Sequence, residues 1–421
     1  MGLAVFAEDG AYSAFTPYSV YGIGNMSKPG TAFNMSMGGV GIATRNRRFV
    51  NTLNPASVTA RDTLSFMADF GLSGQATSYR QGDLKSFNNI LNINDFVISF
   101  PIYKSSAFMI GLTPYTNVGY KFSYIEQDPD IIGHTGTLGY SANGYGSIYQ
   151  LFAGGGVTLF DNLSLGAQFI YYFGNIDKTV DLIFGDSSSR SIYSGYVLQL
   201  NGTTAKLGLQ YEKPISSGHT LTLGATYKFG SKIKGHVTDF AYANLSSQTD
   251  TIRNNVSSPA ENNLKFAGEL GVGLSLRRAE KWSAEIDYLR SDWSGSGFDS
   301  ASGFASVGVN TFSASSSQSI RAGFELTPNR NDIRYMYKRW TYRLGAYYDE
   351  SYYRFNGNTV TAYGITLGMT IPVYMGYNGI TVGLEFGQRG RVTDNMIRER
   401  YFGFNVGFNI FDIWFRKQRY D

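Results

Sequence analysis

The chain has 421 residues, with 36 basic and 32 acidic side chains and a formal net charge of +4 at pH 7. Glycine contributes 50 residues, tyrosine 31 and phenylalanine 30, and cysteine is absent. The absence of cysteine excludes disulfides and thiolate chemistry. The basic residues are scattered, which disfavours nucleic-acid binding. The chain contains no run of about 18 apolar residues, the length that a membrane-spanning helix needs. The composition favours β-structure with one apolar and one polar face.

Residues 1–7 end in Val5-Phe6-Ala7, which fits the small-residue end of a secretory signal peptide. The charged start and most of the apolar core of such a signal are missing from this stretch. We therefore interpret residues 1–7 as a signal-peptide remnant, with an ordinary disordered terminus as the alternative.

Residues 8–60, which we call the leader, are rich in small residues and do not alternate cleanly between apolar and polar positions. Two stretches stand out, Met37-Gly38-Gly39-Val40-Gly41-Ile42-Ala43 and Asn54-Pro55-Ala56-Ser57. Because the strand period is absent, we predict no barrel strand in this part of the chain.

After the leader, apolar and polar residues alternate in segment after segment. In 402–410, phenylalanine, valine and isoleucine fall on one face, and glycine and asparagine fall on the other. The same alternation occurs in 220–229, 363–371 and 380–387, and a period of two is typical of β-strands. It predicts fourteen strands: 63–80, 92–103, 106–124, 145–160, 162–185, 191–212, 219–240, 262–276, 281–291, 316–328, 340–355, 358–372, 379–388 and 398–415.

The connections between these strands alternate in length. Short links such as 104–105 and 161 alternate with mostly longer polar ones, namely 81–91, 125–144, 241–261 and 292–315. Up-and-down barrels of bacterial outer membranes have short periplasmic turns and longer outer loops. A soluble β-sandwich also alternates, but no linker divides the chain into sandwich-sized domains, and a β-propeller would show a blade-like repeat that we do not find.

The predicted fold is therefore all-β: a transmembrane antiparallel up-and-down β-barrel of about 14 strands over residues 61–421, in contact with outer-membrane lipid. Side chains of the wall alone cannot fill the lumen of a barrel with about fourteen strands. We therefore predict that residues 8–60 form an N-terminal hatch, or plug, inside the lumen.

The order of these features resembles the FadL-like outer-membrane transport family of Gram-negative bacteria, and equally the PorV-type barrels of the type IX secretion system. The resemblance rests on the small-residue stretch 37–43, on 54–57 just before the first strand, and on the fourteen strands that follow. It implies a hatch inside the barrel. In transporting members it implies that hydrophobic molecules such as long-chain fatty acids bind in the lumen and leave sideways through the wall, and in PorV-type members it implies a docking or shuttle subunit.

Chemistry other than binding finds little support in the sequence. The three histidines, His134, His219 and His236, fall in predicted turn or outer regions, and none lies on a wall facing an acidic partner at a convincing spacing, so we predict no enzyme, no catalytic residue and no cofactor. His134 is near Asp128 and Asp130, and His236 is near Asp239. A metal site in a loop is the alternative there, but we expect these side chains to be solvated and predict no metal site. Glycine-rich runs such as 154–156 lack the Lys-Ser/Thr of a phosphate-binding loop. They are typical of strand glycines that a plug or a neighbouring strand approaches closely.

Charged residues on the predicted lumen face are more informative. Extending the alternation inward places there the acidic Asp69, Glu269, Glu285, Asp287, Glu325 and Glu385 and the basic Arg321 and Arg343. We predict that the leader residues Arg45, Arg47 and Arg48 pair with this acidic wall and, with Asn54 and Pro55, anchor the hatch, because bidentate Arg–carboxylate contacts are strong where water is limited. The alternative is independent solvation in a wet lumen.

Two prolines fall inside predicted wall strands, Pro101 and Pro114. Proline donates no hydrogen bond to a strand ladder. We therefore predict a kink or lateral opening of the wall at these residues, with a bulge or a position at the barrel rim as the alternative.

Two functions follow. The first is passive uptake of small hydrophobic compounds such as fatty acids, gated by the hatch, with a pocket lined by leader residues Phe15, Tyr18, Tyr21, Phe33, Met35 and Met37. The second is an accessory barrel subunit of an outer-membrane-protein assembly or type IX secretion complex, with other subunits of that machinery as partners. The scarcity of histidine disfavours a third, an outer-membrane enzyme.

Overall fold

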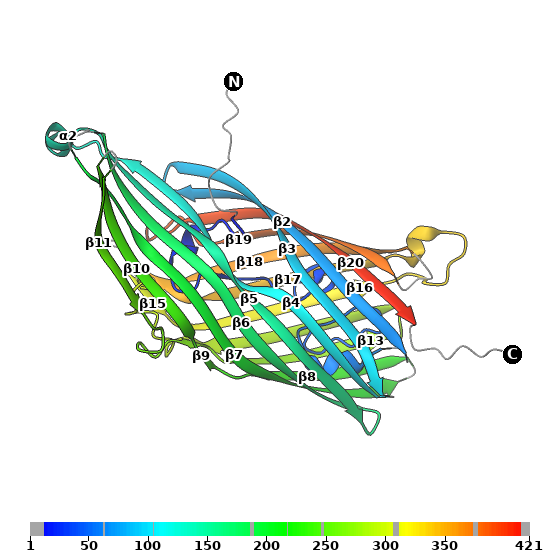
Figure 1. Ribbon diagram of the computed structural model, residues 1–421. Coiled ribbons are helices and arrows are strands. Elements are labelled where there is room, and N and C mark those ends of the chain that lie inside the picture. Colours follow the sequence, from blue (N-terminus) through cyan, green and yellow to red (C-terminus); the bar gives the residue numbers. More distant parts are fainter. Residues whose placement is uncertain are drawn as a thin grey trace.

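The computed structural model describes residues 12–61, 64–103, 105–185, 189–216, 218–245, 248–305, 311–373 and 378–413. The predicted signal-peptide remnant, residues 1–7, lies outside the described residues. Within them the chain forms a closed antiparallel barrel of fourteen strands (Figure 1), because the last strand pairs with the first along sixteen residue positions, from Ser65–Ile413 to Arg80–Arg398. This confirms the predicted fold class.

The barrel strands, in chain order, are β2 (Ser65–Gln81), β3 (Leu84–Tyr103), β4 (Ser106–Ile125), β5 (Leu138–Leu159), β6 (Leu163–Phe184), β7 (Ser191–Ser216), β8 (His219–Lys228) with β10 (Lys234–Leu245), β11 (Gln248–Ser257) with β13 (Glu269–Arg278), β14 (Trp282–Asp292), β15 (Phe312–Ala314) with β16 (Ser316–Leu326), β17 (Thr341–Phe355), β18 (Asn358–Pro372), β19 (Gly379–Arg389) and β20 (Arg398–Ile413). The smaller elements are η1 (Pro17–Val20), β1 (Asn25–Met26), α1 (Ala32–Met35), η2 (Pro55–Thr59), α2 (Pro129–Thr135), β9 (Ser231–Lys232), β12 (Lys265–Phe266) and η3 (Met336–Arg339).

Three of the fourteen strands are interrupted. β7 pairs with β8 along its second half and with β10 along its first half, so β8 and β10 are two parts of one barrel strand. In the same way β13 continues the course of β11, and β16 that of β15.

Alternation along each strand separates an outer apolar face from an inner polar one. On β18, Ile365 and Leu367 are 52% and 44% exposed, whereas Thr366 between them is buried. On β20, Phe404 is exposed and Asn405 is buried. Apolar side chains that face outward and small or polar side chains that face inward are the pattern expected when lipid surrounds a barrel.

Several predicted loops are strands, and these predictions were wrong. β3 begins at Leu84, β5 at Leu138, and β10 and β11 form a hairpin within 234–257. Hydropathy alternates weakly in these stretches, where polar side chains occupy both faces of the extended chain. The backbone nevertheless stays paired, as in the contact of Arg80 with Lys85, because ladder hydrogen bonds do not require an apolar face.

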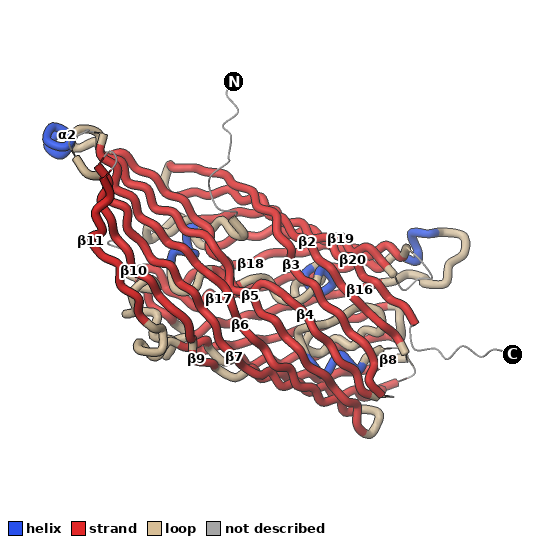
Figure 2. The backbone as a smooth tube through the Cα atoms, in the orientation of Figure 1, coloured by secondary structure: helices blue, strands red, loops and turns tan. Residues whose placement is uncertain are grey.

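The two ends of the barrel differ. One end, which we call the turn end, carries the start of the first barrel strand, β2, and the end of the last, β20. The links at this end are 103–106, 159–163, 216–219, 278–282, 326–341 and 372–379. The other, the loop end, carries α2 and the segment 293–305 (Figures 1 and 2). None of the helices in the described ranges is long and apolar enough to cross a membrane.

Described leader residues lie against the inner face of the wall, and glycines make this approach possible. A Cβ on Gly166 or Gly208 would overlap η2, and one on Gly345 would overlap the backbone of Gly38. Strand glycines often mark close approach of another backbone. We call the following set the glycine band: Gly156, Gly166, Gly208, Gly224, Gly271, Gly273, Gly323, Gly345, Gly368 and Gly407.

Members of the glycine band are opposite one another on several pairs of neighbouring strands. Gly156 of β5 is opposite Gly166 of β6, which is opposite Gly208 of β7. Farther round, Gly224 is opposite Gly273, and Gly323 is opposite Gly345. At these positions the missing side chains leave space over the wall, and leader atoms occupy it.

We predict that Gly345→Ala loosens the leader without breaking the barrel, because the added methyl overlaps the Gly38 nitrogen. Trypsin should then cut sooner after Arg45 and Arg47, whereas heat-dependent gel mobility, which reports the closed barrel, should not change. Gly139→Ala is the matched control, since its methyl would be 3.8 Å from the nearest atom, the Ile183 carbonyl oxygen. Equal trypsin resistance of the two variants would show that the contact at Gly345 is not tight.

Candidate functional site

Two wall carboxylates on β14 hold the leader by its backbone. Asp287 accepts hydrogen bonds from the amides of Gly41 (2.7 Å) and Ile42 (3.0 Å) through one oxygen. Glu285 accepts from the Ala43 amide (2.8 Å) and from the Thr44 hydroxyl. Both carboxylates are buried, so these charge-assisted bonds satisfy amides that water does not reach.

The Asn54–Pro55 stretch fastens the next part of the leader. The Asn54 side chain caps η2 by accepting from the Ala56 amide (3.0 Å) and donates to the Ile42 carbonyl (2.7 Å). Pro55 begins η2 and lies against Gly208 of the glycine band. From β7, Gln210 donates a further bond to the Ile42 carbonyl (2.9 Å). Asn54 and Pro55 thus connect the stretch 54–57 to the stretch 37–43 of the leader and to the barrel wall.

Arg45 and Arg48 of the leader form ion pairs with carboxylates other than those predicted. Arg45 pairs with Glu212 (2.6 Å) and Arg48 with Glu280 (3.2 Å), both near the turn end, and Arg47 is exposed. Burial lowers the pKa of Arg45, and the adjacent Glu212 carboxylate partly offsets that effect. The predicted pairing was wrong for Arg45 and Arg48 because the leader reaches the turn end before these residues, below the level of the predicted acidic wall.

The remaining predicted carboxylates have other partners. Glu385 pairs with the leader residue Lys28, which sequence reasoning did not single out. Glu269 lies 3.7 Å from Lys228, and Glu325 pairs with Arg343 at 2.8 Å, so both are matched within the wall. Glu285, Asp287 and Glu385 are therefore the members of that set that contact the leader directly.

We predict that Asp287→Ala loosens the leader selectively, because it leaves the Gly41 and Ile42 amides buried without an acceptor. Each unsatisfied amide costs about 1–3 kcal/mol, so amide hydrogen exchange at these two residues should accelerate by at least about tenfold. Asp83→Ala, in the exposed β2–β3 turn, is the control. Unchanged exchange at Gly41 and Ile42 would show that Asp287 does not hold this segment.

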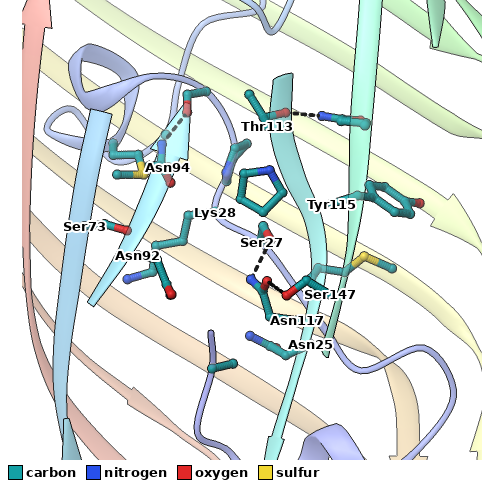
Figure 3. Close-up of a pocket in the computed structure, with 18 of the residues that line it drawn as sticks. Asn25, Ser27, Lys28, Ser73, Asn92, Asn94, Thr113, Tyr115, Asn117 and Ser147 are labelled. Atoms are coloured by element: carbon teal, nitrogen blue, oxygen red, sulfur yellow. Dashed lines mark hydrogen bonds between the residues drawn. The ribbon is translucent and has the colours of Figure 1, made fainter. Parts of the chain in front are cut away.

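A cavity of about 1100 Å³ lies inside the barrel beside the leader. Phe15 and Met35 of the leader line it, together with the apolar wall residues Phe152 and Ile170 and with Trp293 from the segment after β14. Figure 3 shows the polar part of the lining, where Ser27 and Lys28 of the leader lie between side chains of β3 and β4. The polar residues labelled there are Asn25, Ser27, Lys28, Ser73, Asn92, Asn94, Thr113, Tyr115, Asn117 and Ser147.

Four of the six predicted pocket residues do not line this cavity. Tyr18 and Tyr21 are buried among aromatic rings, with Tyr21 stacked on Phe312. Burial raises the pKa of Tyr21 to about 12. Phe33 stacks on Phe49, and Met37 lies against the glycine band at Gly323. The prediction was wrong for these four, because their side chains face the wall and the aromatic cluster.

A cluster of aromatic rings, including Tyr21, Phe312, Trp293 and Phe304, lies toward the loop end of the lumen. Trp293 and Phe304, from the segment that follows β14, are buried with leader and wall rings. Lys178 of β6 ties this region together, since its ammonium donates to the carbonyls of Val20 (2.8 Å), Gly22 (3.1 Å) and Gly303 (2.8 Å). The leader and the outer segment are thus pinned by one buried cation.

The wall itself has a gap between β3 and β4. Their ladder runs from Tyr103–Ser106 to Phe96–Leu112 and stops there, although both strands continue, within described residues, to Leu84 and Ile125. Beyond the end of the ladder, β3 pairs only with β2, and β4 pairs with β5 and the short leader strand β1.

Each edge of this gap carries a β-bulge. On β3, Asn94 is the extra residue, since Gly71 opposes Asp95 and Leu72 opposes Ile93. On β4, Tyr115 is extra in the ladder with β5 and follows Pro114. Bulges bend a strand and end regular pairing. Pro114 therefore lies at the gap, whereas Pro101 lies in the paired ladder opposite Ala107 and does not mark it.

Leader residues cover the gap from inside. β1 pairs with the free edge of β4 through Asn25–Asn117 and Met26–Thr116. On the other edge, Asn94 donates to the Gly30 carbonyl (3.3 Å), and Asn92 donates to a leader carbonyl. Sequence reasoning missed these wall asparagines, although the adjacent polar pair 94–95 interrupts the alternation of β3 and was a usable signal.

The chain matches one protein family, and its fold is similar to those of several solved structures. A family model described as BamG matches residues 1–421, and no curated protein matches the chain. Among solved structures, the toluene transporter TodX of Pseudomonas putida is 13% identical, with 93% of this chain and 100% of that chain covered and a TM-score of 0.58.

Two further solved structures are similar. The toluene transporter TbuX of Ralstonia pickettii is 15% identical, with 91% and 98% of the two chains covered and a TM-score of 0.56. A Pseudomonas aeruginosa FadL homologue is 11% identical, with 93% and 100% covered and a TM-score of 0.58. At these identities the likeness shows a shared fold, and it confirms the resemblance to FadL-like barrels at that level.

Proposed function

The chain belongs to the BamG family and is an outer-membrane β-barrel, and we propose that it admits small hydrophobic compounds passively through the gap between β3 and β4. The gap carries the proposal. An interrupted ladder in a membrane wall leaves backbone groups unpaired, which lipid does not satisfy, so it is tolerated where it lines a cavity or protein covers it. Both conditions hold here.

Residues on both edges of the gap line the cavity. Leu91 and Phe96 of β3 and Leu112 and Pro114 of β4 are among them, so the cavity extends from the lumen to the wall. Leu91 is 67% exposed and Phe96 is 50% exposed, which gives this passage an apolar outer mouth. The names of similar structures, toluene transporters and a monoaromatic hydrocarbon channel, support small hydrophobic compounds as the cargo class. Fatty acids are hydrophobic compounds too, and we include them in the proposed cargo.

In this proposal the leader is the gate. Residues 25–30 close the inner side of the gap, so cargo passes only when β1 leaves the edge of β4. Phe15 and Met35 are the leader residues that would contact cargo in the cavity. Residues 36–57 stay seated on the glycine band, held by Asp287, Glu285 and Asn54. The domain division that goes with it is a remnant 1–7, a hatch 8–60 and a barrel 61–421.

A disulfide that locks β1 to β4 tests the gate. Asn25 and Asn117 are directly opposite each other, so Asn25→Cys with Asn117→Cys places two thiols at bridging distance in a chain that has no other cysteine. We predict that the oxidised variant loses uptake of radiolabelled toluene and oleate by host cells, and that reduction restores it.

The control disulfide is Val180→Cys with Ser194→Cys, which are opposite each other on β6 and β7 away from the gap. It should leave uptake unchanged in both redox states. Uptake through the oxidised Asn25–Asn117 variant at the unlocked rate would show that cargo does not pass this gap.

A second candidate function is an accessory subunit of an outer-membrane machine, favoured by the BamG match and by the link 326–341. This link projects from the turn end, which faces the periplasm in an outer-membrane barrel (Figure 1). Ile333 is fully exposed, and Met336 and Tyr337 are 51% and 53% exposed. Asp332 shapes the link by accepting from the Tyr335 amide (2.7 Å), a bond that lowers its pKa.

Substitution of these apolar side chains tests the second candidate. We predict that the full chain, extracted from its native membrane in mild detergent, carries an outer-membrane assembly protein in fixed stoichiometry, and that Ile333→Ser/Met336→Ser/Tyr337→Ser loses it. Ile252→Ser/Val256→Ser alters exposed apolar residues on β11 at the loop end and should retain the protein. Wild-type chain that elutes without such a protein contradicts this candidate and leaves uptake as the function.

A further inference from the structure

A compact group of buried oxygen atoms lies on the inner wall beneath α1. It comprises Asp69 of β2, Asp95 of β3, and Asn405 and Asn409 of β20, which are 3%, 1%, 3% and 3% exposed. The three strands are neighbours in the barrel, with β2 between the other two. Asp69 is directly opposite Asn409, so their side chains share one face at short range.

Two glycines form the floor of this group. Gly71 of β2 is opposite both Asp95 of β3 and Gly407 of β20. A Cβ on Gly71 would overlap the Asp95 carboxylate, and one on Gly407 would be 3.8 Å from Asp69 Oδ1. Both carboxylates therefore lean over the same side-chain-free patch. Ala32 of α1 covers it, since its Cβ would be 2.5 Å from that of an alanine at 407.

The two carboxylates repel each other without a nearby counter-charge. The Asp69 and Asp95 carboxyl groups interact directly. Across the described ranges of the chain, neither forms an ion pair with a lysine, arginine or histidine, whereas the wall residues Glu269 and Glu325 each do. Removing two like charges from water without compensation is expensive.

Acceptors in the group outnumber donors. Asp69 Oδ1, Asp95 Oδ1, Asn405 Oδ1 and Asn409 Oδ1 are buried and have no hydrogen-bond partner. Asn94 donates from its side-chain amide to Asp95 Oδ2 (2.8 Å), and the side chain of Asn409, whose Nδ2 is also buried without a partner, lies beside Asp69. Buried polar atoms are nearly always satisfied, so several inward-facing oxygens around two negative charges call for a positive ligand.

We propose that Asp69, Asp95 and Asn409 bind one Ca²⁺ ion, with Asn405 at its margin. The donor set contains only oxygen, from two carboxylates and amide groups, which is the set that hard cations prefer. Calcium fits better than magnesium, because flexible oxygen ligands from three strands suit its variable coordination and do not impose an octahedron. Asn94 is a positioning residue that orients Asp95 and also bonds to the Gly30 carbonyl.

The position of the site gives the ion a role. It lies between the wall and the start of α1, and Asn94 joins it to the leader at the edge of the β3–β4 gap. Bound Ca²⁺ would therefore seat residues 30–32 of the leader on β2, β3 and β20. This holds whether the barrel carries hydrophobic compounds or serves as a subunit, so its test does not depend on either function.

Calcium binding by the full-length protein, refolded in detergent without lipopolysaccharide and freed of metal with EDTA, tests the site. Equilibrium dialysis with ⁴⁵Ca²⁺ should give one ion per chain, weakly displaced by Mg²⁺, and thermal unfolding should shift upward with added Ca²⁺. Asp69→Asn and Asp95→Asn should abolish binding. Asn94→Ala should weaken it about 10- to 100-fold, as loss of a ligand-orienting contact does. Asp83→Asn, in the exposed turn, should bind normally.

Wild-type protein that binds no Ca²⁺ overturns the proposal whatever the variants do, and this holds even if a variant fails to fold. Undiminished stoichiometry in both Asp69→Asn and Asp95→Asn overturns it as well, because the ion would then bind elsewhere. If Asp69 and Asp95 instead share a proton, the unfolding temperature will change as pH moves through the range in which these carboxyl groups titrate, but it will not change with Ca²⁺. That result also contradicts the site.

Discussion

The close approach of the leader to the barrel wall depends on the glycine band. A barrel of fourteen strands encloses more space than its own side chains fill, and here a second backbone fills much of it. At Gly208, Gly224 and Gly345, leader atoms occupy the volume where a side chain would begin. Van der Waals contact between two backbones in this way requires glycine on one side, and the band supplies it on strand after strand.

Leader backbone that comes so close to the wall can no longer form hydrogen bonds with water. Side chains form hydrogen bonds to its amides and carbonyls instead. Amides of the leader are met by Asp287 and Glu285, and carbonyls by Asn54, Gln210 and Lys178. Because buried amides and carbonyls are costly when unpaired, the four wall side chains of this set, together with Asn54 of the leader itself, define where the leader lies. This division of labour explains why leader arginines contribute mainly at the turn end, where Arg45 and Arg48 find Glu212 and Glu280.

The ladder between β3 and β4 ends early, and the features on which both proposals rest lie in that sector of the wall. The bulges at Asn94 and Tyr115, the end of the β3–β4 ladder and the strand pairing of β1 all occur within that sector. The oxygen group around Asp69 and Asp95 adjoins it on the side of β2. Residues 36–57 of the leader lie on the glycine band, whereas residues 25–30 lie over the interrupted β3–β4 ladder.

Strand number and the outward apolar face could be deduced from the sequence, because a period of two in residues such as 402–410 reports directly which side chains share a face. Contacts across the lumen could not, since they join residues far apart in the chain. The partners of Arg45 and Arg48, the four predicted pocket residues that face the wall, and the role of Lys28 and Lys178 depended on the depth at which the leader sits. That depth is set by steric fit between two backbones, which local periodicity does not encode, so only the tertiary structure decided it.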